Sequence, residues 1–198
     1  MNSGWLLGTF AIAYLLGSIP FGLLLTRIFG MGDIRAIGSG NIGATNVLRT
    51  GRKGLAIATL LLDLLKGVIA VKLTQHIYGA DVAMLAGLFV VLGHVFPVWL
   101  RFNGGKGVAT TFGAFFALNW MFALTICGIW IVVFFITRFS SLSAIMSICY
   151  SPVIAYLLDG YLTALLCLSL AGIIIFSHRH NLVRLLSGTE MTFRRRSI

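Results

Sequence analysis

The topology of this 198-residue chain depends on residues 107–136, GVATTFGAFFALNWMFALTICGIWIVVFFI. No charged side chain interrupts it. A helix needs about 20 apolar residues to cross the hydrocarbon core of a bilayer, and a single helix of this length would measure about 45 Å. The stretch is therefore too long for one upright span and short for two.

The composition indicates a membrane protein throughout. Hydrophobic residues make up 59% of the sequence and charged residues 10%, against about 45–50% and about 25% in soluble domains. These values exclude a soluble globular domain, and the three cysteines lie inside apolar runs, which excludes a disulfide scaffold. We predict an all-α polytopic integral membrane protein with one domain over residues 1–198. The apolar runs predicted to be helices are Trp5–Ile28, Leu55–Tyr78, Val82–Leu100, Gly107–Leu118, Trp120–Ile136, Leu142–Leu158 and Tyr161–Phe176.

The distribution of positive charge indicates whether residues 107–136 form one helix or two. The net charge is +10, and Lys and Arg are retained on the cytoplasmic side of a membrane. If the stretch turns near Asn119, seven transmembrane helices place the N-terminus outside and the C-terminus inside. Lys66 and Lys72 then lie within a span, and every other basic residue is cytoplasmic. A single helix would instead move Arg138 and the whole C-terminal tail outside. Seven helices are therefore predicted, with two short helices or a re-entrant hairpin left open for residues 107–136. The predicted cytoplasmic basic residues are Arg27, Arg35, Arg49, Arg52, Lys53, Arg101, Lys106, Arg138, Arg179, Arg184, Arg194, Arg195 and Arg196.

The first of three unusual polar segments on the predicted cytoplasmic side is Gly38–Arg49. Its glycines leave backbone N–H groups uncovered, its short polar side chains add donors, and Arg49 offers a fork that suits phosphate. An ordinary Gly/Asn turn between helices is the alternative. The candidate ligand-binding residues in this segment are Ser39, Gly40, Asn41, Gly43, Thr45, Asn46 and Arg49.

The second segment, Arg101–Thr111, opens the predicted helix at the start of the 107–136 stretch. A Gly-rich turn, a lysine and a helix N-terminus together make an anion site. The segment is not a nucleotide P-loop, because Gly107 follows the lysine and no glycine stands at position 100. A plain helix start with a snorkelling lysine is the alternative. The candidate residues are Asn103, Gly104, Gly105, Lys106, Gly107 and Thr110.

The third segment, Ser177–Glu190, carries His178, Arg179, Asn181 and Glu190 as candidates. His178 and Asn181 share one helical face. The alternative is a basic amphipathic stretch on anionic lipid. Two histidines spaced i, i+2 do not share a helical face, so no metal site is predicted.

Three ionisable residues of the predicted spans are of functional interest. Asp63 and Lys66 are spaced i, i+3 and can pair inside the membrane, where such groups are costly and face protein or a water-filled cavity. Lys66 is therefore either a structural partner of Asp63 or a second cation at an anion site. His94 is close in sequence to the second segment, which makes it a candidate site residue as well.

The three segments together resemble the motifs of the bacterial acyl-phosphate-dependent glycerol-3-phosphate acyltransferases, the PlsY family. Ser39–Arg49 resembles the first motif, Gly104–Thr110 the second, and His178–Leu182 with Gly188–Glu190 the third. The resemblance implies acyl transfer from acyl phosphate to the sn-1 hydroxyl of glycerol 3-phosphate, without metal or cofactor. It implies these two substrates and the lipid bilayer as partners, no nucleic acid, and a bacterial inner-membrane enzyme whose active site faces the cytoplasm. Asn103 and Leu182 depart from the residues frequent in the family.

We expect the following roles. The first segment binds the acyl-phosphate head, with Arg49 clamping a phosphate, and the second binds a phosphate, that of glycerol 3-phosphate by analogy with the family. His178 and Asn181 orient glycerol 3-phosphate, and Glu190 holds the tail in place. The general base is His178, whose imidazole titrates near neutral pH, or a substrate phosphate. A transporter for an organic phosphate and an anionic-lipid-binding scaffold are the rival functions.

Overall fold

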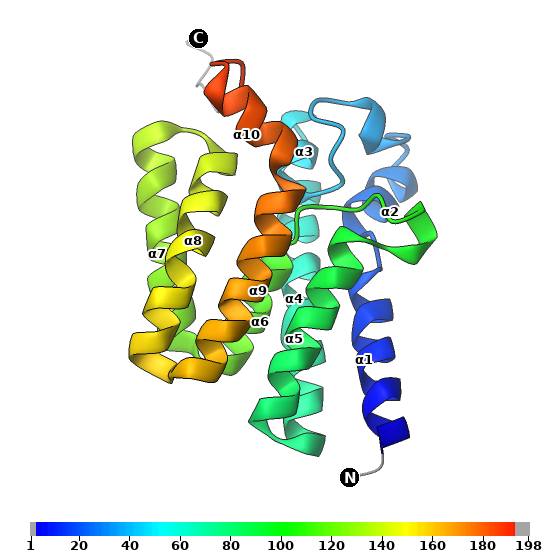
Figure 1. The fold of residues 1–198 in the computed structure, drawn as a ribbon. Coiled ribbons are helices and arrows are strands. Elements are labelled where there is room, and N and C mark those ends of the chain that lie inside the picture. Colours follow the sequence, from blue (N-terminus) through cyan, green and yellow to red (C-terminus); the bar gives the residue numbers. More distant parts are fainter. Residues whose placement is uncertain (1–2, 193–198) are drawn as a thin grey trace. The chain divides into compact units, whose positions relative to one another are not determined.

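A computed structural model describes residues 3–192, and within them all regular secondary structure is helical. The chain divides into two compact units, Met1–Asn119 and Trp120–Ile198 (Figure 1). Three of the predicted cytoplasmic arginines, Arg194, Arg195 and Arg196, lie outside the described residues.

The first unit is a bundle of long helices with short helices at one end. Helix α4 packs against α5 and α6, and α1 packs against α5. The elements are α1 (Ser3–Gly17), α2 (Phe21–Ile28), the 3₁₀ turn η1 (Ile34–Ala36), α3 (Ala44–Arg49), α4 (Lys53–Tyr78), α5 (Ala80–Val95), the 3₁₀ turn η2 (Val98–Leu100) and α6 (Val108–Leu118).

The structure breaks two runs that hydropathy predicted as continuous. Trp5–Ile28 is divided between α1 and α2, which meet at an angle of 41°. Pro20 lies at the break and explains it. Proline has no backbone N–H to donate, and it disfavours the helical conformation at the residue before it. Val82–Leu100 likewise leaves the helix at Val95, two residues before Pro97.

Glycines allow the long helices of this unit to pack at backbone contact. A Cβ at Gly67 of α4 would overlap the Thr110 carbonyl of α6, and one at Gly113 of α6 would overlap the Leu64 carbonyl of α4. Gly17 and Gly93 form the same reciprocal arrangement between α1 and α5. Small residues at helix interfaces are typical of membrane bundles, where close van der Waals contact stabilises association.

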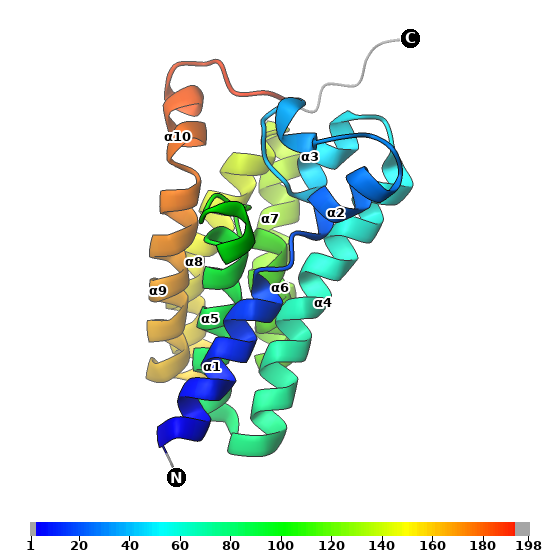
Figure 2. The ribbon, with the colours of Figure 1, turned by 90° about the vertical axis from the view of Figure 1, so that its right-hand side faces the viewer.

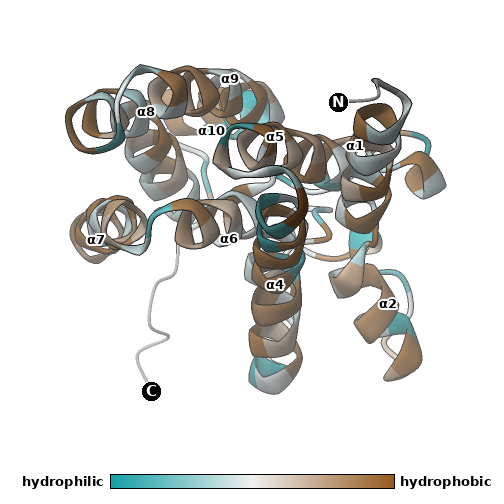
Figure 3. Cartoon of the chain, turned by 90° about the horizontal axis from the view of Figure 1, so that it is seen from below, coloured by the Kyte–Doolittle hydropathy of each residue, from teal (hydrophilic) through white to brown (hydrophobic). Residues whose placement is uncertain are grey.

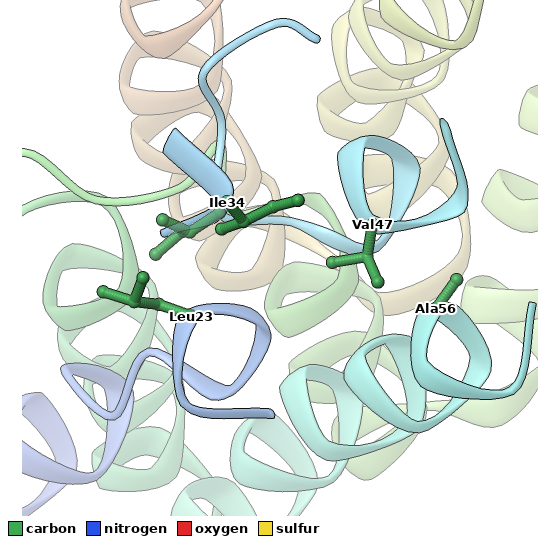
Figure 4. Close-up of a cluster of buried hydrophobic side chains, with 5 residues drawn as sticks. Leu23, Ile34, Val47 and Ala56 are labelled. Carbon is green, nitrogen blue, oxygen red and sulfur yellow. The ribbon is translucent and has the colours of Figure 1, made fainter. Parts of the chain in front are cut away.

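The loops that carry the first two polar segments lie at the end of this unit opposite the N-terminus (Figures 1 and 2). A small apolar core holds them there, and Figure 4 shows its side chains converging from α2, η1, α3 and α4. Leu100, just before the second segment, packs against this core and so attaches the second loop to the first. The core residues are Leu23, Ile34, Ile42, Val47 and Ala56.

The second unit consists of α7 (Trp120–Thr137), α8 (Ser140–Asp159), α9 (Tyr161–Ser177) and α10 (Arg179–Leu186). Helix α8 packs against both α7 and α9. Ser143, Ser147 and Ser151 recur every four residues along α8, are buried, and return their hydroxyls to carbonyls of their own helix. Pro152 removes the N–H that would bond the Ile148 carbonyl, and the Ser151 hydroxyl donates to that carbonyl instead, at 2.8 Å.

Residues 107–136 form two helices, α6 and α7, with Asn119 in extended conformation between them. The helix is therefore interrupted at Asn119, where the turn is predicted. Among the described residues, four helices are long and apolar enough to cross a membrane, and two bent pairs raise this number to six. Apolar residues cover α7 on every side (Figure 3). Helix α6, with 11 residues, is shorter than these spans. Seven spans and the orientation of the termini stay predictions.

Candidate functional site

The first polar segment is organised by one buried side chain, Asn46. Its Nδ2 group donates to the carbonyls of Ile34, Ile37 and Asn41 at 2.8–3.1 Å, and its Oδ1 accepts the backbone N–H of Ser39 at 2.9 Å. The carboxamide is thus occupied by the loop backbone. The structure therefore favours a positioning role for Asn46 over the ligand contact expected from the sequence.

The other candidates of this segment lie around that anchor. Asn41 Oδ1 accepts the Gly43 N–H at 2.9 Å, which closes a tight turn before α3. Gly40 is exposed with a φ of 71°, a left-handed conformation that glycine adopts without strain. Ser39, Thr45 and Arg49 are half-buried, and the Arg49 stem lies beside Gly38. The segment thus presents short polar groups and one guanidinium on a fixed backbone.

An ion-paired aspartate ties α2 to η1 just before this segment. Asp33 accepts hydrogen bonds from the side chains of Arg27 and Arg35 and from the Arg35 N–H. The hydrogen bonds from Arg35 hold the pKa of Asp33 well below its usual range, and the same pairing raises the pKa of Arg35. Asp33 is therefore a charged anchor for the loop and a poor proton acceptor.

The second segment is a loop held by main-chain hydrogen bonds to the end of α5. Gly104 N–H donates to the Val95 carbonyl and Gly105 N–H to the His94 carbonyl, both at 3.0 Å. The ring of His94 fills the space where a Cβ at Gly105 would stand. Asn103 is exposed and turns its amide to the Arg101 carbonyl at 2.9 Å, within its own loop.

The loop ends at the N-terminus of α6. Gly107, with a φ of 80°, is the N-cap, and Lys106 is half-buried beside it. The first N–H groups of a helix have no acceptor within the helix, and the helix dipole adds positive potential there. Thr110 and Thr111 are buried in this first turn, and the Oγ1 atoms of both have no hydrogen-bond partner among residues 3–192. The arrangement suits an anion.

Behind this loop lies a buried cluster of three ionisable residues from the predicted spans, Asp63, Lys66 and His94. Lys66 Nζ is 2.9 Å from Asp63 Oδ1 and donates to the carbonyls of Gly17 and Ile19. His94 Nδ1 is 3.5 Å from Asp63 Oδ1. Of the two roles left open for Lys66, the structure favours the partner of Asp63, because its ammonium group is surrounded by protein oxygens. His94 is buried and contacts the second loop from behind.

In the second unit, His178 stands at the junction of α9 and α10, where the helix axis bends by 64°. Its side chain is buried, and Nδ1 lies 2.8 Å from the Ile174 carbonyl. A carbonyl oxygen only accepts, so Nδ1 carries the proton and the lone pair of the neutral ring is on Nε2. Nε2 is therefore the atom of this ring that can accept a proton.

Glu190 is the centre of a second polar cluster in this unit. Its Oε1 accepts from Asn181 Nδ2 at 2.6 Å and from Ser141 Oγ at 2.7 Å, and its Oε2 accepts from Arg184 Nε at 2.8 Å. Burial alone would raise the pKa of Glu190, but the hydrogen bonds from Arg184, Ser141 and Asn181 outweigh it and lower the pKa below its ordinary 4.5. The carboxylate therefore ties the tail to α8 and α10, as expected, and is a weak base.

The remaining candidate of the third segment is Arg179. Arg179 is exposed, donates to the Phe176 carbonyl at 3.1 Å and stacks on the Phe176 ring, so its guanidinium lies on its own helix.

Ser141, which bonds Glu190, was not predicted as a site residue. It stands between Ser140 and Ser143 at the start of an apolar run, and only its hydrogen bond to Glu190 distinguishes it from them. A weak signal was available, since the start of this run follows Arg138 on the predicted cytoplasmic side.

Each unit thus contributes one assembly of polar groups. In the first, the two Gly-rich loops share a core and present Arg49, Lys106 and the α6 N-terminus. In the second, His178 and Asn181 are held one helical turn apart on α10, with Glu190 fixing Asn181. Cationic groups and backbone N–H donors bind phosphate, and an imidazole with a lone pair on Nε2 accepts a proton.

Comparison with known proteins agrees with these motifs. Residues 7–188 match the family model described as glycerol-3-phosphate acyltransferase. The chain is similar to the glycerol-3-phosphate acyltransferase of Nitrobacter winogradskyi, with 54% identity over 91% of this chain and 92% of the relative. The protein of that name from Mesorhizobium japonicum shares 55% identity over 89% of this chain and 90% of its own.

Solved structures give the same result. The fold is similar to the crystal structure of PlsY, an integral membrane glycerol 3-phosphate acyltransferase, in its glycerol 3-phosphate form. The TM-score is 0.91 at 36% identity, and the match covers 96% of each chain. The lysophosphatidic acid form of the same protein matches with a TM-score of 0.89.

Gly105→Ala is expected to destabilise the protein because the new Cβ would displace the His94 ring. Adding His94→Ala removes that obstacle, so the loss in melting temperature caused by Gly105→Ala should largely disappear in the His94→Ala background. Gly104→Ala is the control, because its Cβ would meet Pro97 and the His94 carbonyl, which His94→Ala leaves in place. Thermal unfolding of detergent-solubilised wild type and five variants, namely the three single substitutions and each glycine substitution combined with His94→Ala, measures the coupling. Additive effects for Gly105 and His94 would contradict it.

Acid is expected to release the tail from α8. Because the pKa of Glu190 is lower in the folded protein, its contribution to stability is complete above about pH 4.5 and is lost as the pH falls through the folded pKa. Glu190→Gln should lower the melting temperature by about 2–6 °C at pH 7 and have less effect at pH 3. Melting curves at both pH values test this, and an equal loss at pH 3 and pH 7 would show that the charge is not responsible.

Proposed function

Because this chain belongs to the glycerol-3-phosphate acyltransferase family, we propose that it transfers a fatty acyl group from an acyl phosphate to the sn-1 hydroxyl of glycerol 3-phosphate. The products are 1-acyl-glycerol 3-phosphate and inorganic phosphate, and the reaction is the first acylation of phospholipid synthesis. The observation that carries the proposal is the family match over residues 7–188, which includes the first two motifs and the His178–Leu182 part of the third.

The chemistry needs few proton-transfer groups. An acyl phosphate is an activated mixed anhydride, so the hydroxyl oxygen attacks its carbonyl carbon, the bond from that carbon to the phosphate oxygen breaks, and phosphate leaves. The hydroxyl proton passes to a base. The protein must hold two anions together, orient the hydroxyl and stabilise the oxyanion and the leaving phosphate.

The two loops of the first unit supply the anion-binding groups in this proposal. The first loop, with Ser39, Asn41 and Arg49, receives the acyl-phosphate head. Gly104–Gly107 and the N-terminus of α6 receive the phosphate of glycerol 3-phosphate, with Lys106 as the cation. The positive potential of a helix N-terminus and the left-handed Gly107 support this assignment.

The second unit supplies the groups that orient the hydroxyl. His178 accepts its proton at Nε2, or a phosphate oxygen of the substrate accepts it instead. Asn181, fixed by Glu190, orients glycerol 3-phosphate. The hydrogen bond from Nδ1 to Ile174 supports His178 as base because it leaves the ring lone pair on Nε2.

We further propose seven spans, with the N-terminus outside, the C-terminus inside and the active site at the cytoplasmic face of the bacterial inner membrane. The break at Asn119 supports this topology, because it divides the 107–136 stretch where charge requires a turn. The short helix α6 would then be shielded by neighbouring protein or thin the bilayer locally.

The deciding experiment uses detergent-purified wild type with palmitoyl phosphate and glycerol 3-phosphate. We expect release of orthophosphate in step with formation of 1-acyl-glycerol 3-phosphate. Palmitoyl-CoA in place of palmitoyl phosphate should give no product. Absence of release from palmitoyl phosphate would refute the proposed reaction.

Lys106→Ala is expected to raise the KM for a phosphate substrate by about tenfold or more, because a charge-assisted hydrogen bond to phosphate is lost. Lys72→Ala is the matched control, since Lys72 is exposed on α4 and bonds Gln75. Initial rates over a range of each substrate measure the effect. Unchanged KM values for both substrates would remove Lys106 from the phosphate site.

His178→Gln separates the two candidate bases. A general base contributes about 10²–10⁴-fold to rate, so loss of the imidazole should lower kcat by at least about 100-fold if Nε2 accepts the proton. Glutamine keeps a donor for the Ile174 carbonyl, which limits damage to the helix junction. Turnover near that of wild type would assign the proton to the substrate phosphate.

Single cysteines test the topology. In a background without Cys127, Cys149 and Cys167, Asp81→Cys should react with a membrane-impermeant maleimide in intact spheroplasts, and Arg138→Cys only after permeabilisation. Mass shift on a gel measures the labelling. Reaction of Arg138→Cys in intact spheroplasts would favour a single helix over residues 107–136.

A further inference from the structure

The break between α1 and α2 leaves backbone carbonyls inside the bundle without their regular helical hydrogen-bond donors. Helix α1 ends at Gly17 and α2 begins at Phe21, so the carbonyls near the break lose regular helical partners (Figure 2). Pro20 cannot donate. In a bilayer an unpaired carbonyl costs several kcal/mol by general estimate, so such a break persists only where protein groups satisfy it.

Lys66 supplies hydrogen-bond donors to these carbonyls. Its ammonium group donates to the Gly17 carbonyl at 2.8 Å and to the Ile19 carbonyl at 3.0 Å, and Asp63 Oδ1 lies 2.9 Å away. An ammonium group has three N–H donors, and three protein oxygens surround this one. The Lys66 side chain is 1% exposed and that of Asp63 4%. The ammonium group is thus enclosed by protein, two carbonyls accept its hydrogen bonds, and Asp63 balances its charge.

Asp63 is also close to His94, which contacts the second loop. His94 Nδ1 lies 3.5 Å from Asp63 Oδ1, the His94 ring fills the space at Gly105, and the His94 carbonyl accepts the Gly105 N–H. A parallel link runs from Tyr14, whose hydroxyl donates to the Phe96 carbonyl at 2.6 Å. The break before the first loop and the backbone of the second loop are therefore connected through buried side chains.

We propose that Lys66 is a positioning residue, which together with Asp63 and His94 fixes the α1–α2 break and holds the Gly104–Gly107 loop in the shape that binds substrate phosphate. This buried chain of Lys66, Asp63 and His94 acts on the site through the backbone of the second loop, and Lys66 itself contacts no substrate. The inference rests on the proposed function only in naming phosphate as the ligand of that loop.

A paired substitution tests the proposal. Asp63→Leu with Lys66→Met removes both charges and leaves neither buried alone, which proteins tolerate far better than the loss of one partner. Lys72→Met, on the same helix but exposed, is the matched control. Amide hydrogen exchange over residues 15–21 and 103–108 is measured without substrate, and KM and kcat are measured with palmitoyl phosphate and glycerol 3-phosphate.

We expect faster exchange in both segments, by about tenfold or more, and a rise of similar size in the KM for a phosphate substrate, with kcat changed less than about threefold. Lys72→Met should match wild type. Wild-type exchange over residues 103–108 in the double variant would overturn the proposal, whatever happens to KM, because the chain would then not reach the loop. Since exchange is read without substrate, inactivity of the wild type would refute the proposed reaction and leave this test intact.

A measurement on the wild type decides the matter if the double variant does not fold. Acetylation of lysines with an amine-reactive ester, followed by mass spectrometry, reports on Lys66 directly. We expect Lys66 to stay unmodified in the folded protein with and without glycerol 3-phosphate, while Lys72 is modified in both. Acetylation of Lys66 in the folded protein, protected by glycerol 3-phosphate or not, would overturn the proposal.

Discussion

The requirement that every backbone polar group be satisfied inside the hydrocarbon governs this structure. Continuous helices meet it without help, and each interruption needs a local donor. At the α1–α2 break that donor is Lys66, which reaches the Gly17 and Ile19 carbonyls from another helix. At Pro152 the donor is the neighbouring Ser151 hydroxyl. The first solution brings a buried charge into the bundle, and with it the need for Asp63.

The same requirement identifies the polar groups that hold the loops. Asn46 and the His94 carbonyl bind loop backbone, although the first looks like a ligand-binding residue in the sequence. What the loops then present are cationic side chains, Arg49 and Lys106, and the N-terminus of α6. A rigid loop presents such groups at lower entropic cost than a flexible one, which explains why so many polar side chains of the motifs turn inward.

Hydropathy and charge predicted much of the fold, including the turn near Asn119, because length and positive charge act over whole helices. They did not predict the break near Pro20, since a sliding apolar average does not register a single missing N–H. The role of Lys66 stayed open for a related reason: the carbonyls that decide it lie almost 50 residues earlier in the chain. The polar motifs were recognisable from local pattern, but Ser141 was not, because nothing in the sequence distinguishes it from its neighbours Ser140 and Ser143.

The acidic residues complete the argument about proton transfer. Asp33 is bound by two arginines, Asp63 by Lys66, and Glu190 by Arg184 together with two neutral donors. The two that lie outside the predicted spans and close to a motif, Asp33 and Glu190, both have lowered pKa values, so each is a weaker base than an ordinary carboxylate. Every carboxylate close to a motif therefore positions a neighbour. The proposed acyl phosphate chemistry tolerates this, because the leaving phosphate is already activated, and the proposal gives the proton of the attacking hydroxyl two candidate acceptors, His178 Nε2 and the substrate itself.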